Sequence, residues 1–511
     1  MKCHLSVFFG IILAVNIQPA TAQTTGQASG YIMYSPLQET TTYLIDPDGN
    51  THHTWNCSKG PASTAHLLPD GSIMRPYKVS NPTMNGGATG GGMQRIDWDG
   101  NVLWDFTWVE ENHQQHHECI PIEQADGSYN ALIIAWERKS NAEAIQAGRQ
   151  DVEDEMWPTE IVEIAPDGSN GGIVVWEWHF WDHLCQDVDP TKDNYYVDGC
   201  NNHPELFDIN EGNISSGGPF GGSGGDWIHA NGMDYSPELD QIVFSAHKTD
   251  EIYVIDRSTT TVEAASHEGG DANVGGDFLY RWGNPQNYGA GTEDDQILYV
   301  VHGANFIDPG YPGEGNIMVF NNGDREGNAN DYSSVEEITP PLSGSNYALP
   351  WNQEQTWIYS NGATFYANHL SGAFRLPNGN TLASEGTSCR MTEVNTDGDI
   401  VFQHTHAGGG NIAKATFYPA TYEGLIDLHV SAEEVTEQFV RIFPNPAQNQ
   451  LTIEAEIGAQ IKMLDITGRT VFQQKQQTLK DVIDIKICSK GVYFVEVRTE
   501  QMSTTNKIII Q

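Results

Sequence analysis

Short runs of alternating apolar and polar residues dominate the chain between residues 31 and 425. Each run is bounded by Gly, Asp, Asn or Pro, and long amphipathic helical patterns are scarce. Alternation with a period of two is typical of strands that bury one face, and the bounding residues favour tight turns. The pattern therefore predicts an all-β protein.

Two kinds of unit alternate along this region. One ends in a turn followed by a strand, as in HLLPDGSIMRP, HHECIPIEQADGSYNALIIAWE, HANGMDYSPELDQIVFSAH, HGANFIDPGYPGEGNIMVF and HLSGAFRLPNGNTLASEG. The other is a hairpin that finishes near an aromatic residue, as in YLIDPDGNTHHTW, RIDWDGNVLWDF and MTEVNTDGDIVFQH. Each unit supplies about two strands, so a pair forms a four-stranded sheet. Repeated four-stranded sheets are the signature of a β-propeller.

The number of units sets the expected number of blades. The chain contains six hairpin units and five turn-strand units, and NIAKATFYPATYEGL (residues 411–425) is the candidate for the missing sixth. We predict a six-bladed β-propeller over residues 23–430, with five or seven blades as alternatives. A different composition begins near residue 436, with short strands, few tryptophans and more lysine. Residues 436–511 are predicted to form a small C-terminal β-sandwich.

The N-terminus has the features of a secretory signal peptide. MKCHLSVFFGIILAVNIQPATAQ contains a lysine, a short apolar run and a small-residue ending, which predicts a signal peptide over residues 1–22 with cleavage after Ala22. No later segment has about 20 continuous apolar residues, so we expect no integral membrane segment. Six cysteines then remain in an oxidising compartment, and Cys185 and Cys200 are the best candidates for a disulfide.

The formal net charge of −43, with only 25 basic residues, excludes some partners. Such a surface repels nucleic acid and anionic lipid. An anionic substrate would need a local positive feature, so basic residues close to candidate chemistry matter most.

Four histidines recur at one position of the repeat. His117 and His369 each lie ten residues before a turn glycine, and His302 lies eleven before one. His229 precedes MDYSPELDQIVF by an equivalent distance, without the glycine. Because the innermost strand of each propeller blade begins at one end of the central channel, residues at one repeat position converge there. The spacing predicts that the four histidines line one channel mouth.

A ring of imidazoles has two chemical uses. Metal binding is one, and HQQHHEC adds local density, but zinc and iron sites usually include carboxylates or thiolates in tight spacing. Catalysis on an anion is the other, since neutral imidazole is a nucleophile near pH 7 and protonated imidazole donates to developing negative charge. Arg325, in VFNNGDREGN, adds a permanent charge suited to oxyanions. We expect catalysis that uses no metal and no cofactor.

At these residues the chain resembles the bacterial arylsulfotransferases, exported aryl-sulfate sulfotransferases that need no nucleotide sulfate donor. The resemblance spans roughly residues 31–425 and rests on DWIHANGMDYSPELDQIVFSAHKTDEIYVIDR, NIMVFNNGDR, HLSGAFRLPNGNTL and MTEVNTDGDIVF. Residues 436–511 resemble the C-terminal sorting domain of type IX secretion cargo of Bacteroidota, in FPNP, LDITGR, KGVYFVEV and KIII. This second resemblance implies the type IX secretion machinery as a partner and a secreted or cell-surface location.

The first resemblance implies a reaction and roles for particular residues. The family moves a sulfuryl group from a small-molecule aryl sulfate to a phenol through a sulfohistidine intermediate. His369 falls where the sulfated histidine is expected, and His229 or His302 would protonate the leaving phenolate. Arg325 would stabilise the charge on the sulfuryl oxygens. Further candidates for substrate contact are His117, His247, Trp227 and Asn231.

Three other interpretations remain open at this stage. A secreted or cell-surface binding propeller would use the histidines structurally, since a fold alone does not give a function. A quinoprotein-like dehydrogenase is suggested by the Asp-Gly-Trp hairpins, but it would have about eight blades and a repeated T-G-K-x-x-W pattern. A calcium-supported lectin would use DVDPTKD (Asp187, Asp189 and Asp193), although this spacing is not that of an EF-hand.

Overall fold

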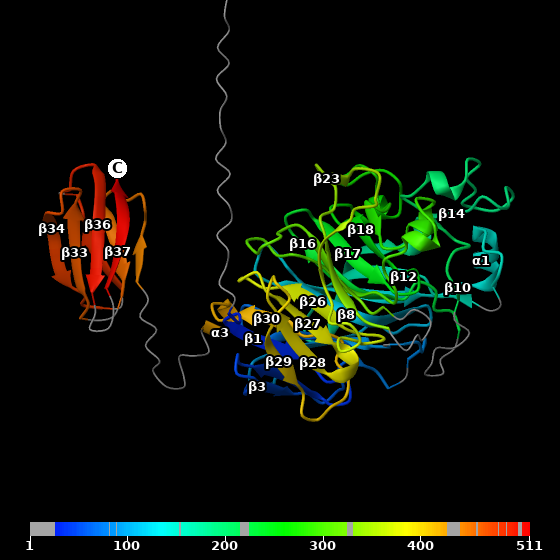
Figure 1. Cartoon of the computed structure of the whole chain (residues 1–511), viewed down its shortest axis with the longest axis horizontal. Helices are drawn as coiled ribbons and strands as arrows, with labels where there is room; N and C mark the ends of the chain where they lie inside the picture. The colour runs from blue at the N-terminus through cyan, green and yellow to red at the C-terminus, as the bar shows by residue number, and fades with distance from the viewer. Residues whose placement is uncertain are drawn as a thin grey trace, which may run out of the picture. The chain divides into compact units, whose positions relative to one another are not determined.

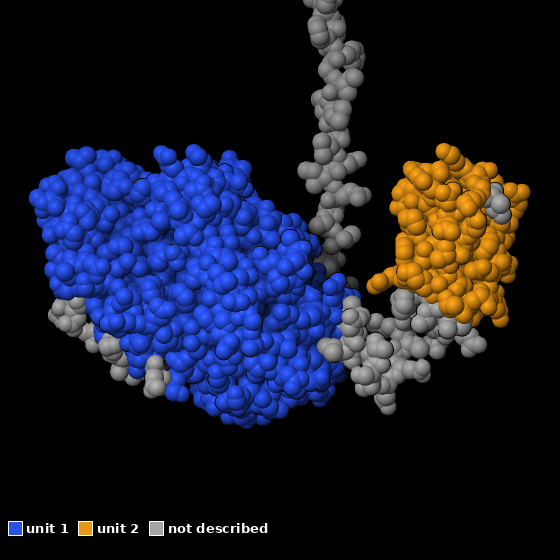
Figure 2. Space-filling model, turned by 180° about the vertical axis from the view of Figure 1, so that it is seen from behind, with its two compact units in different colours: residues 1–428 blue, residues 429–511 orange. Residues whose placement is uncertain are grey.

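The structure is a computed structural model, and it describes residues 26–80, 82–87, 89–152, 155–214, 224–323, 331–426, 440–455, 458–478, 480–486, 488–498 and 503–511. The chain divides into two compact units, residues 1–428 and residues 429–511, which Figure 2 colours separately. The predicted signal peptide, residues 1–22, lies outside the described residues. Within the described ranges, no helix is both long and apolar enough to cross a membrane.

Six four-stranded antiparallel sheets form the first unit, which confirms the predicted propeller (Figure 1). We number them as blades 1 to 6 and give their strands from the first to the fourth. Blades 1 to 3 consist of β30 (Thr416–Pro419), β1 (Gly30–Tyr34), β2 (Thr41–Ile45) and β3 (Thr51–Asn56); of β4 (His66–Leu67), β5 (Ile73–Lys78), β6 (Gly91–Ile96) and β7 (Val102–Thr107); and of β8 (His113–Glu123), β9 (Tyr129–Glu137), β12 (Thr159–Asp167) and β13 (Gly171–His179). Blades 4 to 6 consist of β16 (Ala230–Ser236), β17 (Gln241–Ala246), β18 (Glu251–Asp256) and β19 (Tyr280–Trp282); of β20 (His302–Phe306), β21 (Ile317–Asn321), β22 (Ser334–Ile338) and β25 (Gln355–Tyr359); and of β26 (Gly372–Arg375), β27 (Thr381–Glu385), β28 (Arg390–Val394) and β29 (Ile400–Thr405).

Short elements occupy the connections between these strands. The small strands are β10 (Lys139–Ser140), β11 (Glu155–Met156), β14 (Leu184–Cys185), β15 (Phe207–Asp208), β23 (Leu342–Ser343) and β24 (Asn346–Tyr347). The α-helices are α1 (Asn141–Ala147), α2 (Thr261–Ala264) and α3 (Glu423–Ile426), and the 3-10 helices are η1 (Phe180–Asp182), η2 (Cys200–Asn202), η3 (Pro285–Tyr288), η4 (Glu293–Asp295) and η5 (Gly386–Ser388).

Blade 1 closes the ring with strands from both ends of the unit. Strand β30 pairs with β1, so that Ile32 lies opposite Phe417, and Figure 1 shows the two strands side by side in blue and orange. The phenol oxygen of Tyr418 accepts the backbone N–H of Leu67 at 2.8 Å, which joins blade 1 to blade 2. The segment expected to supply the sixth turn-strand unit thus supplies the first strand of the closing blade.

The local sequence explains why these hairpins form. Gly127 and Gly379, the glycines that define the ten-residue histidine spacing, have φ angles of 82° and 89°, which favour glycine over residues with a side chain. The aromatic residues that end the hairpins are buried, among them Trp55, Trp104 and Trp178. Their large apolar surfaces fill the space within and between sheets, where most of the stabilisation by burial arises.

The second unit is a two-sheet sandwich, as predicted. One sheet contains β31 (Arg441–Phe443), β32 (Gln450–Glu454) and β35 (Lys480–Asp484), and the other contains β34 (Thr470–Lys475), β33 (Gln460–Asp465), β36 (Gly491–Arg498) and β37 (Ser503–Ile510). The inward-facing apolar residues of both sheets form one core of their own, which includes Ile453, Ile461 and Val497.

The cysteines differ from the expectation. All six cysteines of the predicted mature chain, each within the described ranges, are free thiols. Cys185 and Cys200 pack in one buried cluster with Leu206, so the two residues are close together, as expected. The predicted disulfide between them is not formed.

Three glycines bring the first strands of blades 4, 5 and 6 unusually close together. A Cβ atom added to Gly232 would lie 2.5 Å from the backbone nitrogen of Gly303, and one added to Gly303 would lie 2.9 Å from the Cα of Gly372. First strands of neighbouring blades also contact one another around the ring, β8 with β16, β16 with β20 and β20 with β26. The axis is therefore packed backbone against backbone at this level.

This packing predicts that Gly303→Ala destabilises the propeller more than Gly310→Ala. Both glycines have positive φ, 65° and 82°, so each substitution should cost about 1–2 kcal/mol of backbone strain. Only at position 303 would the new methyl group also meet backbone, adding about 1–3 kcal/mol. Urea unfolding of the two variants measures the difference, and equal midpoints would contradict the proposed close packing.

Candidate functional site

In three blades, the first strand departs from regular pairing beside a histidine. The pairing register shifts next to His117 in β8, next to His229 at the start of β16, and next to His302 in β20. Such bulges re-aim side chains and are common beside active sites. His117 and His229 also have φ angles of 50° and 56°, a strained conformation for residues with a side chain. Blades 3, 4 and 5 thus share one backbone irregularity at the predicted repeat position.

The histidine rings form a continuous series. The Nδ1 atoms of His116 and His117 lie 2.7 Å apart. The ring centroids of His117 and His229 are 4.8 Å apart, and those of His229 and His247 are 4.4 Å apart. His247 and His302 continue the series at 5.6 Å. The structure therefore brings together three histidines of the predicted set, His117, His229 and His302, whereas His369 makes no contact with these rings in the described part of the chain.

His302 ends this series, and His369 is connected to it through the backbone of its neighbour Leu370, but the two side chains are held differently. His302 Nδ1 donates to Asn322 Oδ1 at 2.8 Å, and its Nε2 accepts the backbone N–H of Leu370 at 3.2 Å. The fold thus uses both nitrogens of His302. His369 is half-buried, and its Nδ1 donates to Asn368 Oδ1 at 2.8 Å. Because this bond places the proton on Nδ1, the lone pair of His369 is on Nε2.

A buried carboxylate, which the sequence analysis did not assign, holds His229. Asp226 Oδ2 accepts the Nδ1–H of His229 at 2.6 Å, and Lys248 Nζ lies 2.9 Å from the same oxygen. Trp136 Nε1 donates to the other oxygen at 3.1 Å. Burial alone would raise the pKa of Asp226, but His229 and Lys248 hold that pKa well below its usual range. The signal in the sequence was the D-W-I-H motif, which places the aspartate three residues before the histidine.

A second charged pair borders the histidines. Lys414 Nζ lies 3.1 Å from Glu118 Oε1, which also accepts a hydrogen bond from Ser63 Oγ at 3.2 Å. Together with His117 and His302, these residues line a cavity of ≈ 10 Å³, room for about one water molecule. No motif marks Lys414, which precedes the closing strand β30, so only the assembled ring reveals it.

Burial determines the protonation of the imidazoles. Desolvation lowers the pKa of His116 and His302 to about 3, and that of His369 to a smaller extent. Desolvation and neighbouring imidazoles lower the pKa of His117 and His247 well below its usual value. These groups are therefore uncharged at neutral pH. His247 Nδ1 is buried and has no hydrogen-bond partner in the described part of the chain, so it is available to a bound water or ligand.

The remaining predicted residues have other surroundings. The ring of Trp227 is fully buried and packs edge-on against Phe180, so it belongs to the apolar core and offers no face for an aryl ring. Trp227 was predicted to contact the substrate, but in the structure it packs in the core. Asn231 lines the cavity, but its amide already donates to the carbonyl of Val301 at 2.7 Å. Arg325 lies outside the described residues.

Several solved structures resemble the chain only distantly. A protein of unknown function from Bacteroides caccae is 12% identical, with a TM-score of 0.39 and coverage of 76% of this chain and 99% of its own. A periplasmic gluconolactonase from Pseudomonas aeruginosa is 11% identical, with a TM-score of 0.37 and coverage of 76% and 98%. The Cps50 (Swd1) β-propeller domain from Myceliophteria thermophila is 9% identical, with a TM-score of 0.34 and coverage of 85% and 95%. No curated protein matches the chain.

Two protein families match the chain, one for each unit. The secretion system C-terminal sorting domain matches residues 441–511, which indicates a secreted or cell-surface protein that uses the type IX secretion machinery. The family described as arylsulfotransferase (ASST) matches residues 16–423, and this range contains every candidate site residue. Because that match covers well over half of the 511 residues, the chain belongs to the arylsulfotransferase family.

Proposed function

We propose that this protein is an aryl-sulfate sulfotransferase, which moves a sulfuryl group from an aryl sulfate to a phenol through a sulfohistidine. The reaction needs neither a nucleotide sulfate donor nor a cofactor. The observation that carries the proposal is the series of uncharged imidazoles around His229, whose Nδ1–H is held by the Asp226 carboxylate. Membership of the arylsulfotransferase family supports it.

His369 is the proposed nucleophile. Its Nδ1–H bond to Asn368 leaves the lone pair on Nε2, and burial lowers its pKa, so the ring is neutral and nucleophilic at pH 7. Nε2 attacks the sulfur of the aryl sulfate, an N–S bond forms, and the bond from sulfur to the aryl oxygen breaks. The electron pair of that bond leaves with the phenolate.

His229 is the proposed acid and base. Asp226 fixes the ring by accepting its Nδ1–H and stabilises the imidazolium form, so Nε2 is the nitrogen that exchanges protons. In the first half-reaction, Nε2–H protonates the leaving phenolate. In the second, the neutral Nε2 takes the proton of the acceptor phenol as its oxygen attacks the sulfohistidine sulfur, which breaks the N–S bond and restores His369.

His302 and Lys414 are assigned supporting roles. Both nitrogens of His302 are engaged, and its Nε2 holds the backbone of Leu370, so His302 positions the adjacent His369 rather than protonating the leaving group. Lys414 and the proposed Arg325 would stabilise negative charge on the equatorial sulfuryl oxygens, by analogy with phosphoryl transfer.

The first prediction concerns turnover. Incubation with p-nitrophenyl sulfate and a phenol acceptor should release p-nitrophenolate and leave one SO₃ group on the peptide that contains His369. Substitution of the nucleophile in His369→Ala should lower kcat at least about 10³-fold. Product absorbance and peptide mass spectrometry measure the two effects.

The matched control is His404→Ala, on β29, the fourth strand of the same blade, which should keep wild-type turnover. Loss of turnover in His302→Ala but not in His369→Ala would identify a different nucleophile. No turnover with any of several aryl sulfates would favour a non-catalytic binding propeller instead.

The second prediction tests Asp226 as a positioning residue. Asp226→Asn should lower kcat by about 10²–10⁴-fold, because the amide no longer favours the Nδ1–H tautomer or the imidazolium of His229. The loss should be larger with phenyl sulfate than with p-nitrophenyl sulfate, since the less acidic phenol needs more protonation as it leaves. An equal loss with both donors would point to a purely structural role.

The third prediction concerns pH and stability. His302 has a pKa of about 3 in the folded protein, below the ordinary value of about 6.5, so between these values the unfolded chain binds a proton that the folded protein excludes. His302 therefore lowers the free energy of unfolding as pH falls below 6.5, and the loss is about 2 kcal/mol at pH 5. Urea unfolding at pH 7.5 and pH 5.0 should show a smaller loss of stability in His302→Gln than in the wild type. An unchanged pH dependence would contradict the burial of a neutral imidazole.

A further inference from the structure

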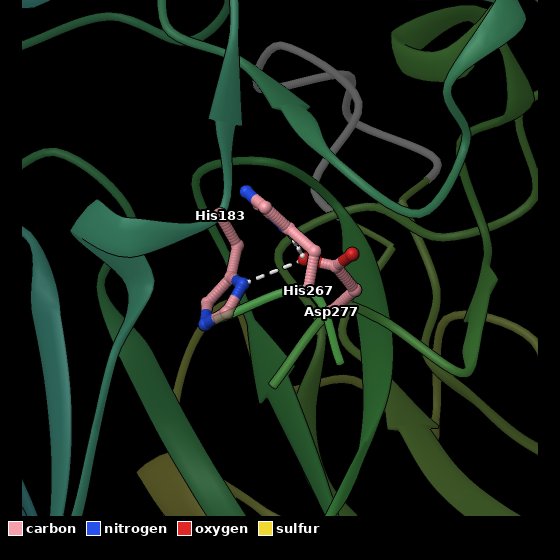
Figure 3. Close-up of side chains that lie close together, drawn as sticks. All are labelled: His183, His267 and Asp277. Carbon is pink, nitrogen blue, oxygen red and sulfur yellow. Dashed lines mark hydrogen bonds and ion pairs between the residues drawn. The ribbon is translucent and has the colours of Figure 1, made fainter. Parts of the chain in front are cut away.

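Three potential metal ligands converge near the ends of blades 3 and 4, apart from the series of histidines at the axis. His183 directly follows η1 at the end of β13, the fourth strand of blade 3. His267 follows α2, and Asp277 precedes β19, the fourth strand of blade 4. Figure 3 shows the three side chains directed toward one another.

Their donor atoms are close enough to share one ion. The Nδ1 atoms of His183 and His267 each lie 2.8 Å from Oδ1 of Asp277, and the three donor atoms all lie within 4.8 Å of one another. The side chains of His183 and Asp277 are 0% and 7% exposed, whereas that of His267 is 52% exposed. Two ligands are thus fixed inside the protein and the third opens toward solvent, which provides a route of entry.

The ring of His183 is held with its Nδ1 toward the carboxylate. Nε2 lies 2.9 Å from the carbonyl oxygen of Ala264, which can only accept, so Nε2 carries a hydrogen. The ring stacks on Trp178 at an interplanar angle of 5°, and a Cβ atom on Gly276 would lie 2.6 Å from Nε2. Metal-binding histidines commonly donate their second N–H to a carbonyl in this way, which fixes the tautomer.

In the neutral form, this arrangement points a nitrogen lone pair at a carboxylate oxygen. Two electron-rich atoms 2.8 Å apart require a cation between them, either a proton or a metal ion. Among the described residues, no lysine or arginine forms an ion pair with Asp277. The cluster of Glu137, Glu160 and His179 differs, because Lys139 Nζ lies 2.7 Å from Glu137 and already supplies a cation.

We propose that His183, His267 and Asp277 form a binding site for Zn²⁺. Two imidazole nitrogens and one carboxylate oxygen are a donor set that suits this ion, and water from the exposed side would complete a tetrahedron. The ion ties the connection after α2 in blade 4 to the end of β13 in blade 3. Its role is structural, so it is independent of the sulfuryl-transfer proposal.

The experiment uses the mature protein after treatment with EDTA and removal of the chelator. Calorimetric titration with ZnCl₂ at pH 7.5 should detect a tight site in the wild type, and Zn²⁺ should raise Tm. His267→Ala should fold, because His267 is exposed. It should lose the tight site or weaken it by more than about tenfold, since even the loss of an outer-shell partner weakens metal binding about 10–100-fold. Circular dichroism checks that the variant is folded.

The matched control is His203→Ala. His203 is a histidine with a 21% exposed side chain and carboxylate partners of its own, Asp198 and Glu205, but it does not belong to the cluster. This variant should bind Zn²⁺ as the wild type does. Asp277→Asn provides a second test, because it should abolish the visible absorption of Co²⁺ bound in place of Zn²⁺. A wild type without a tight site, or unchanged Zn²⁺ binding in His267→Ala, would overturn the proposal in favour of a cluster held by hydrogen bonds alone.

Discussion

The geometry of the candidate site follows from the close approach of the first strands at the propeller axis. At Gly232 and Gly303, the backbones of neighbouring blades leave no space for a side chain, and a Cβ atom on Gly372 would lie 3.0 Å from the side chain of Lys414. Immediately before these tight contacts, the strands bulge or take left-handed conformations. Those irregularities direct the histidine side chains into the site. The packing of the ring and the composition of the site therefore follow from the same geometry.

The environment at the axis differs from that of the protein surface. The chain carries a formal charge of −43, yet the two buried carboxylates near the histidines, Asp226 and Glu118, each have a lysine within 3.1 Å. Removing paired charges from water is expensive, so such pairs contribute little to stability by themselves. Their presence beside uncharged imidazoles agrees with the proposed sulfuryl transfer, since a low-dielectric site strengthens every hydrogen bond to a developing charge.

Function and export are assigned to separate units. All candidate site residues belong to the propeller, whereas the residues that match the sorting domain form a sandwich with its own apolar core. Each unit thus buries hydrophobic residues of its own, as separate domains do.

The elements and their repetition could be predicted from the amino-acid sequence, because alternation, Asp-Gly turns and hairpin-ending aromatics act over a few residues. These features gave the all-β class, six blades, the sandwich and the shared repeat position of His117, His229, His302 and His369. Tertiary structure alone decided the contacts between blades. It placed Lys414 beside Glu118, engaged both nitrogens of His302, buried Trp227 and brought His183 and His267 to Asp277. These interactions join residues that are far apart in the chain, so their distances are fixed only when the ring closes and its sheets pack.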